Sequence, residues 1–184
     1  MIERIVLASN NAGKLAELQA MFAPLGLHLV QQGELGIPEA EEPHRTFVEN
    51  ALAKARNASQ HSGLPGVDTA FYATQFGYAK GDDNNVKALL EQMRDVANRR
   101  AALVSTLVAV RTPEDPEPLI AVGRAPGEIA RQPQGSHGFG FDPVMFIPAF
   151  GKTFAELPPE VKNANSHRGK AAAQMVQLIR ERWL

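Results

Sequence analysis

Apolar positions along the chain follow two different spacings. Residues 5–8 form a continuous apolar run, which is typical of a strand covered on both faces. Leu15, Leu18 and Phe22 follow at helical spacing, after a short polar stretch. The chain therefore opens with a predicted strand, loop and helix. A second strand is predicted over residues 27–30, after a Pro-Leu-Gly break.

Three more helices are indicated by caps and apolar spacing. Thr46 and Glu49 fit a capping box, which predicts a helix that continues to Gly63. An Asp-Asn-Asn cap at residues 83–85 predicts the next helix, and the last one is predicted to begin near Ser166.

The stretch between these helices is rich in β-forming residues. Residues 101–111 and 119–124 flank a Thr-Pro-Glu-Asp-Pro turn, which predicts antiparallel neighbours, and residues 144–147 predict a short buried strand. Strands and helices of this kind, in parallel and antiparallel pairs, predict an α/β fold with a three-layer mixed sheet flanked by helices.

Composition and charge then exclude several classes of protein. The chain has 184 residues, 44% of them hydrophobic, which favours one globular domain with two lobes. Nineteen basic against twenty acidic residues give a net charge of −1, which argues against a nucleic-acid partner. The absence of cysteine excludes disulfides and thiolate chemistry. No apolar run suits a signal peptide or a membrane span, so we expect a cytoplasmic location.

The segment between the first strand and the first helix is the first candidate site. A helix N-terminus offers free N–H groups and partial positive charge, which suit a phosphate. Gly13 allows close backbone approach and Lys14 adds a full charge, but Leu15 stands where a Walker A loop has Ser or Thr. On this segment alone, a capped helix with a solvated lysine is the simpler interpretation.

A glycine- and phenylalanine-rich segment at residues 135–143 is the second candidate. Glycines beside Phe139 and Phe141 suit a flat ring that lies on an aromatic face while the backbone approaches its edge. Asp142 could orient a base or a neighbouring cation. A tight turn whose phenylalanines enter the core is an equal alternative, and His137 is read as a surface histidine.

Two charged clusters complete the candidates. Lys162, His167 and Arg168 lie at or near the start of the last helix, where the helix dipole opposes cations, so a nearby anion or keto oxygen would explain them better than stability does. Glu41 and Glu42 precede a helix and either face water or bind Mg²⁺ together with substrate phosphates.

In order, these segments resemble the inosine triphosphate pyrophosphatase family, which removes non-standard purine nucleoside triphosphates. The resemblance rests on Ser-Asn-Asn-Ala-Gly-Lys at 9–14, Glu-Glu at 41–42, Thr-Phe-Val-Glu-Asn at 46–50, Gly-Phe-Gly-Phe-Asp-Pro at 138–143 and Ser-His-Arg-Gly at 166–169. No single segment is specific for the family. The ordered set, which covers nearly the whole chain, is specific.

The resemblance implies hydrolysis of ITP, dITP and XTP by water at the α-phosphorus, giving the monophosphate and pyrophosphate. It implies an elongated fold with a central cleft, a homodimer, and Mg²⁺ held by Glu42. Phe139 would be the platform for the purine, and donors aimed at its 6-keto oxygen would reject adenine. The implied substrate-binding residues are Ser9, Asn10, Asn11, Ala12, Gly13, Lys14, Phe139, Gly140, Phe141, Asp142, Lys162, Ser166, His167 and Arg168.

One departure from the family pattern concerns catalysis. The family carries an Asp-Asp-(Ser or Ala)-Gly-Leu segment on a central strand, and its acid serves as general base. Here residues 61–65 run directly into residues 66–72, so no family catalytic acid can be assigned. Asp68 lies close to this junction, but it is predicted to fall in a turn and to be a poor substitute. A lost strand would leave its neighbours without hydrogen bonds.

The departure leaves three hypotheses open. The chain is an active pyrophosphatase, or it is an impaired nucleotide-binding remnant. The third reading is the related family that cleaves modified pyrimidine triphosphates, and the Ser-His-Arg cluster argues against it. A broken chain near Pro65 would mean that residues were omitted from the sequence.

Overall fold

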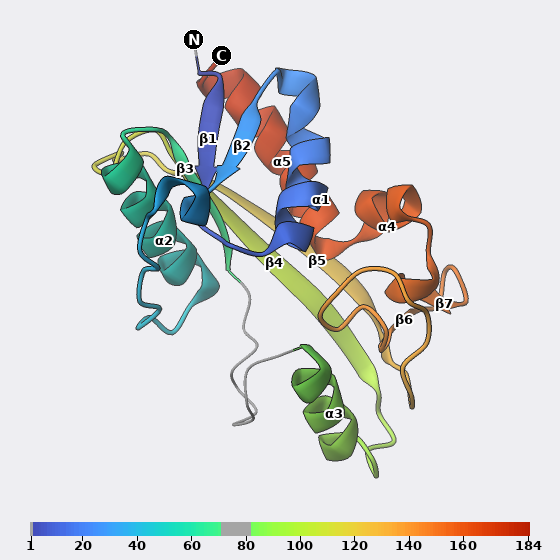
Figure 1. Ribbon diagram of the computed structural model, residues 1–184. Helices are drawn as coiled ribbons and strands as arrows, with labels where there is room; N and C mark the ends of the chain where they lie inside the picture. Colours follow the sequence, from blue (N-terminus) through green and yellow to red (C-terminus); the bar gives the residue numbers. More distant parts are fainter. Residues whose placement is uncertain (1, 71–81) are drawn as a thin grey trace. The chain divides into compact units, whose positions relative to one another are not determined.

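The computed structural model describes residues 2–70 and 82–184 (Figure 1). The chain divides into two compact units. The first comprises Met1–Phe71, Val104–Gly123 and His167–Leu184, and the second comprises Tyr72–Leu103 and Arg124–Ser166. Each unit includes part of the two longest strands, β4 (Arg100–Val110) and β5 (Leu119–Ile129).

The first unit combines the N-terminal elements of the chain with its last helix. Its other elements are β1 (Arg4–Leu7), α1 (Ala12–Phe22), η1 (Ala23–Leu25), β2 (His28–Gln31), η2 (Gln32–Leu35), α2 (Phe47–Ser62), β3 (Gly66–Ala70) and α5 (His167–Arg182).

The second unit holds shorter elements. They are α3 (Asp82–Gln92), β6 (Met145–Ile147), β7 (Lys152–Thr153), η3 (Phe154–Glu156) and α4 (Pro159–Asn165). Helix α3 begins at Asp82, so residues 83–85, which were predicted to cap it, lie in its first turn. The acidic Asp83 is favourable there because the helix N-terminus carries partial positive charge.

The strands of the described residues are hydrogen-bonded in the order β2-β1-β3-β4-β5-β6-β7. Strand β1 pairs in parallel with β2 and β3, and β3 pairs with β4 in antiparallel direction. Strand β6 is antiparallel to both β5 and β7. Parallel and antiparallel pairs in one sheet confirm the predicted α/β class. Strand β5 reaches Ile129 rather than residue 124, because its alternation of buried and exposed residues continues.

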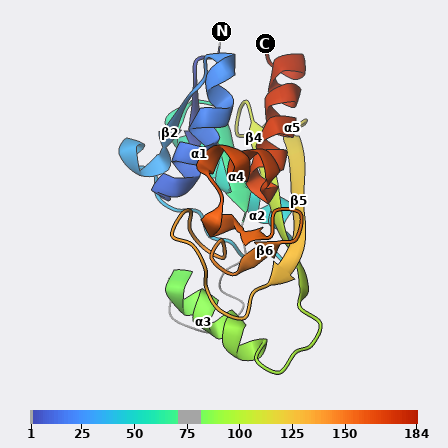
Figure 2. The ribbon, with the colours of Figure 1, turned by 90° about the vertical axis from the view of Figure 1, so that its right-hand side faces the viewer.

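Helices cover both faces of the sheet in the first unit. Figures 1 and 2 show α1 and α5 side by side on one face and α2 on the opposite face. A continuous apolar run such as Ile5-Val6-Leu7 suits this arrangement, because a strand between two helical layers buries both of its faces. The predicted helical layers are therefore present in this unit.

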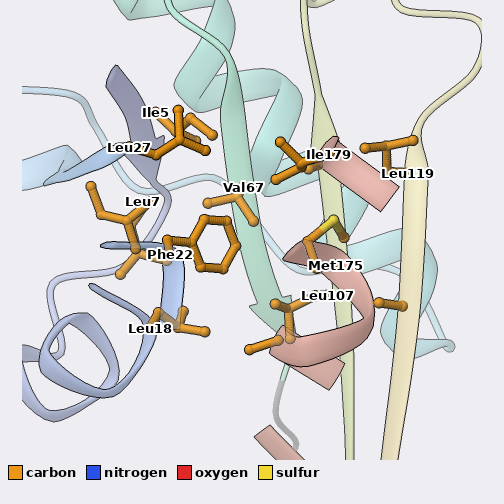
Figure 3. Packing of buried hydrophobic residues seen from close by; sticks show 14 of the residues in the cluster. Ile5, Leu7, Leu18, Phe22, Leu27, Val67, Leu107, Leu119, Met175 and Ile179 are labelled. Carbon is orange, nitrogen blue, oxygen red and sulfur yellow. The ribbon is translucent and has the colours of Figure 1, made fainter. Parts of the chain in front are cut away.

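The main core of the first unit lies between the sheet and the α1–α5 layer. Figure 3 shows Phe22 of α1 and Met175 of α5 meeting Val67 of β3, and all three are fully buried. Trp183, at the end of the chain, packs half-buried against this cluster. It also lines a pocket of about 750 Å³ with residues from the start of the chain, including Ile2 and Glu3.

Helix α2 begins and ends where its sequence predicts. Thr46 accepts a hydrogen bond from the backbone N–H of Glu49, whose side chain returns to the Thr46 N–H. This is the predicted capping box. The helix ends at Gly63, which has a φ of +68° and is therefore in the left-handed conformation that glycine adopts readily.

Strand β3 corrects the prediction for the segment after Pro65. The prediction of a turn at Asp68 is wrong, because residues 66–70 form a central strand paired on both sides. Pro65 and Gly66 both lie beside β1, since the Val6 N–H donates to the Pro65 carbonyl over 2.8 Å and Val6 pairs with Gly66. The neighbouring strands β1 and β4 therefore keep their hydrogen bonds.

Glycine makes this strand compatible with helix α2. A Cβ atom on Gly66 would lie 2.1 Å from the carbonyl oxygen of Ala55. Only glycine lets the helix backbone come this close to the strand. Val67 faces the core on the other side, so Gly66 and Asp68 share the face that α2 covers.

Candidate active site

The loop between β1 and α1 is built by its own polar side chains. Asn11 is the N-cap of α1, and its side-chain oxygen accepts a hydrogen bond of 2.9 Å from the backbone N–H of Lys14. The buried Ser9 hydroxyl accepts one from the Asn11 N–H over 3.2 Å. Ala12 and Gly13 open the helix. The predicted segment thus presents the N-terminal end of a helix, which suits an anion.

Asn10 has a structural role in the same loop. Its side-chain oxygen accepts a 2.9 Å hydrogen bond from the Gly33 N–H, and its amide donates to Glu39 over 3.3 Å. These bonds tie the loop to the segment that follows β2.

Lys14 points from the first turn of α1 toward the end of β3. Its ammonium donates to the Thr69 carbonyl over 3.2 Å. Burial lowers the pKa of Lys14 below its usual value, although the nearby Asp68 opposes this shift. A desolvated ammonium at a helix N-terminus gains from an anionic ligand, so the solvated lysine of the simpler interpretation is wrong.

Lys54 joins two carboxylates in the same unit. Its ammonium lies 3.2 Å from Glu42 and 3.5 Å from Asp68. Burial opposes the charge on Lys54, but the two carboxylates outweigh it and raise the pKa of Lys54. At Asp68, burial dominates and raises the pKa of the carboxyl, with Lys54 and Lys14 opposing. Glu42 is thus part of a charged cluster.

Glu42 is held near this cluster by a buried asparagine. The Asn50 side chain accepts a hydrogen bond of 3.0 Å from the His44 N–H and donates one of 3.1 Å to the His44 carbonyl. Both bonds fasten the loop that carries Glu42 to helix α2. Asn50 and Lys54 lie one helical turn apart, so they share a face. No local spacing in the sequence identifies Lys54, because its two acidic partners come from other elements.

The basic residues at the start of α5 have an acidic partner that the sequence analysis missed. The buried Arg168 guanidinium donates to Glu17 of α1 over 2.7 Å. Arg168 also contacts the ring of the buried His167 over 3.2 Å. The predicted nearby anion is therefore supplied by the protein itself. Gly123 allows this helix start to approach β5, since a Cβ there would overlap the His167 carbonyl.

The glycine-aromatic segment forms a second cluster, in the second unit. Lys162 lies 2.6 Å from Asp142, and its ammonium stands 5.1 Å from the centre of the Phe139 ring. Asp142 also accepts a 2.9 Å hydrogen bond from the Phe139 N–H. Gly138, with a φ of +77°, leaves no room for a side chain beside Asp142. The half-buried Phe139 thus has a cation and an oriented backbone beside it.

The remaining predicted residues of the second unit surround this cluster. Gly140 has a φ of +65°, and the carbonyl of the half-buried Phe141 accepts from the Met145 N–H over 3.0 Å. The buried Ser166 ends α4 and donates its N–H to the Lys162 carbonyl over 2.7 Å. Phe141 is therefore a turn residue, whereas Phe139 faces charged groups.

The predicted residues thus fall into two sets. Residues 9–14 and Glu42 share the first unit with His167 and Arg168, whereas residues 139–142, Lys162 and Ser166 belong to the second. Within residues 2–70 and 82–184 no three His, Asp or Glu side chains group as metal ligands. No helix in the described part of the chain is long and apolar enough to cross a membrane.

Comparison with known proteins agrees with the family resemblance. The sequence matches the Ham1 family over residues 5–178. A protein of Albidiferax ferrireducens named dITP/XTP pyrophosphatase is 73% identical, with 98% of this chain and 100% of that protein covered. A protein of the same name from Polaromonas naphthalenivorans is 71% identical, with the same coverage.

Solved structures agree with the fold. A HAM1 protein from Coxiella burnetii is 37% identical, has a TM-score of 0.87, and the match covers 98% of this chain and 100% of that one. The Ham1 protein of Staphylococcus aureus is 28% identical, with a TM-score of 0.81 and coverage of 97% and 98%.

The length of the first alignment bears on the segment predicted to be absent. That alignment spans 198 residues, whereas this chain has 184, so at least 14 positions of the relative have no counterpart here. This difference in length agrees with a segment that is absent from the interior of this chain.

Proposed function

Since the chain belongs to the Ham1 family, we propose that it hydrolyses the non-standard purine nucleoside triphosphates dITP, ITP and XTP to the monophosphate and pyrophosphate. The names of its relatives support this substrate class. The observation that carries the proposal is the pair of lysines in the first unit. Lys14 and Lys54 lie largely buried near the N-terminal end of α1, where a polyphosphate would meet both cations and the helix N–H groups.

The residues at the start of α1 would bind and orient the triphosphate. The helix N–H groups and the side chains of Ser9, Asn11 and Lys14 supply hydrogen bonds and positive charge to its oxygens. Phosphoryl transfer requires little covalent chemistry from a protein, so holding the α-phosphorus in line with water is the main task. The water proton passes to a base that the family pattern does not identify in this chain.

A divalent cation fits the acidic groups next to these lysines. The Glu42 side chain is partly exposed and lies beside the buried Asp68, so oxygen ligands suited to Mg²⁺ are present. Glu42 would hold the ion. When bound, Mg²⁺ supplies positive charge that neutralises the phosphate oxygens during cleavage.

The cluster around Phe139 would receive the purine. Its ring offers an aromatic face, and Asp142 and Lys162 lie beside it. We assign Ser166, His167 and Arg168 to reading the base. A hydrogen-bond donor that faces the 6-keto oxygen of hypoxanthine or xanthine would have no acceptor when adenine, with its 6-amino group, is bound. This loss would give selectivity against adenine nucleotides.

Pyrophosphate release tests the proposal directly. We expect release from dITP, ITP and XTP with Mg²⁺ and much slower release from dATP, measured by a coupled pyrophosphate assay. Lys14→Gln should lower kcat/KM by about 100-fold or more, because a buried cation on the phosphates is lost. Lys87→Gln, an exposed lysine of α3, is the matched control and should leave the rate unchanged. Binding of ITP by the unaltered protein without turnover would refute catalysis.

A homodimer belongs to the same proposal. Strand β5 exposes Ile120 and Val122, two apolar side chains on one face of the first unit, and their exposure supports an interface. Light scattering of the purified protein tests the prediction, and a mass of one chain at micromolar concentration would contradict it. The predicted cytoplasmic location suits a substrate drawn from the free nucleotide pool.

A further inference from the structure

Asn10 lies between Ser9 and Asn11, two residues that would bind phosphate, but its own side chain reaches a different part of the first unit. Its side-chain oxygen accepts a hydrogen bond of 2.9 Å from the Gly33 N–H, and its amide donates to Glu39 over 3.3 Å. Both the oxygen and the nitrogen of the Asn10 side chain are therefore bonded to the chain that follows β2.

The bond to Gly33 resembles a helix cap that is supplied by another element. Gly33 lies in the first turn of η2, where backbone N–H groups have no partner within the helix. A side chain that satisfies such a group normally comes from the residue just before the helix. Here it comes from the loop between β1 and α1, 23 residues earlier in the chain. The bond therefore joins two segments, and does not merely stabilise one turn.

Glycine at position 33 provides room for the Asn10 side chain. The backbone of Gly33 is not in the left-handed region, so alanine could adopt the same conformation. A Cβ atom there would lie 2.5 Å from the Asn10 side-chain oxygen, which is too close for an ordinary contact. Gly33→Ala would therefore displace the Asn10 amide and leave residues 9–14 unaltered in sequence.

The second bond of Asn10 reaches the loop between η2 and α2. Its acceptor, Glu39, follows Pro38, whose carbonyl accepts a hydrogen bond of 2.8 Å from Asn57 of α2. Asn50 of the same helix fastens the other end of this loop. The loop is thus fixed to α2 at two points, and Asn10 bonds to a loop that is itself held in place.

We propose that Asn10 is a positioning residue, which holds the phosphate-binding residues of the loop between β1 and α1 in place and does not itself contact the substrate. This inference rests on the proposed function, which assigns that loop to the triphosphate. The Asn10 side chain fixes the loop from outside, through Gly33 and Glu39. Loss of these bonds lets the loop move, and phosphate binding then weakens although no phosphate ligand has changed.

A direct contact between Asn10 and phosphate makes a different prediction. Glu39 is an exposed acid, so its removal takes a negative charge away from the anion site and by charge alone should strengthen the binding of a polyphosphate. Its removal also breaks one of the two bonds of Asn10, which weakens binding if Asn10 positions the loop. Glu39→Ala therefore distinguishes the two roles by the sign of its effect. Glu39→Gln keeps the acceptor oxygen and isolates the effect of charge.

The experiment measures the binding of tripolyphosphate in excess Mg²⁺ by isothermal titration calorimetry. Tripolyphosphate has the phosphates of the substrate and no base, so its affinity reports on the phosphate site. The variants are Asn10→Ala, Gly33→Ala, their double variant, Glu39→Ala and Glu39→Gln. Asn98→Ala is the matched control, because this exposed asparagine of the second unit also accepts a backbone hydrogen bond, from Arg100 over 3.2 Å. Melting temperatures are recorded for every variant.

We expect Asn10→Ala and Gly33→Ala each to raise the Kd for tripolyphosphate about five- to tenfold, as for the loss of hydrogen bonds of ordinary strength. The double variant should match the single variants, because both substitutions break the same contact. Glu39→Ala should raise the Kd about threefold, through loss of one bond. Glu39→Gln should bind at least as tightly as the unaltered protein, and Asn98→Ala should match it.

Three results would overturn the positioning role. They are unchanged or tighter binding in Glu39→Ala, losses that add in the double variant, and lower melting temperatures with unchanged affinity. Pyrophosphate release from dITP is measured separately. This pattern of tripolyphosphate binding in a protein that releases no pyrophosphate would support the positioning role and refute the proposed function. Pyrophosphate release with unchanged tripolyphosphate binding in Glu39→Ala would do the reverse.

Discussion

Asp68 and Asp115 are both buried aspartates of the first unit, but their surroundings move their pKa values in opposite directions. At Asp68, burial outweighs the nearby charges of Lys54 and Lys14 and raises the pKa of the carboxyl. Burial acts on Asp115 in the same sense. It is outweighed by the backbone N–H groups of Arg111 and Glu117, which donate over 2.9 and 3.0 Å and hold the pKa of Asp115 below its usual value. Asp115 is therefore a stabilising turn cap, whereas burial of the Asp68 carboxylate is unfavourable.

This difference predicts how Asp115 affects stability at low pH. A carboxyl whose pKa is lower when folded stabilises the protein above its unfolded pKa of about 3.8. That contribution is lost as pH falls through the folded pKa. Asp115→Asn should therefore destabilise the protein at pH 7, and its difference from the unaltered protein should shrink below about pH 4. Urea unfolding at pH 7, 5, 4 and 3 measures it, with the exposed Asp95→Asn as control. A constant difference across that range would contradict the prediction.

Individual site residues could be predicted where they belong to a short sequence motif. Lys14, Glu42 and Arg168 follow from short segments, and the structure places each among charged groups. Lys54 and Glu17 could not be identified in this way, because each meets its partners only through the packing of separate elements. A lone charged residue on a helix is most often solvated.

At the scale of elements, apolar spacing and caps predicted α1, α2, α3 and α5, whereas helix α4 and strand β3 were not predicted. The Pro65-Gly66 pair is a turn signal, and Asp68 is disfavoured in strands. The segment forms a strand because it lies between β1 and β4, whose backbone N–H and C=O groups need partners on that side. Tertiary context of this kind has no local signature in the sequence.

The close approach of α2 to β3 predicts a large effect for a small substitution. In Gly66→Ala the new methyl group would lie 2.1 Å from the Ala55 carbonyl oxygen, so helix and strand must separate. We expect a loss of about 1–3 kcal/mol in the free energy of unfolding, as for overpacking elsewhere. Gln60→Ala, exposed on the same helix, should change it by less than about 0.5 kcal/mol. Chemical denaturation measures both changes, and a Gly66→Ala variant as stable as the unaltered protein would contradict this packing.

At the scale of the whole molecule, stability should depend on nucleotide and metal together. A non-hydrolysable dITP analogue with Mg²⁺, at 100 times its dissociation constant, adds about 2.7 kcal/mol to the free energy of unfolding. For a chain of this length, that corresponds to a rise of roughly 5–10 °C in the melting temperature. EDTA should remove most of the rise, because the cation neutralises the phosphates. Thermal unfolding with the dATP analogue is the control, and an equal shift there would contradict purine selectivity.

The position of Trp183 has a practical consequence for such measurements. It is the only tryptophan of the chain, and it packs against the core of the first unit. Intrinsic tryptophan fluorescence therefore follows the unfolding of that unit alone, whereas circular dichroism follows the helices of both. Coincident fluorescence and dichroism curves would mean that the two units unfold as one cooperative system, and separated curves would assign a free energy to each.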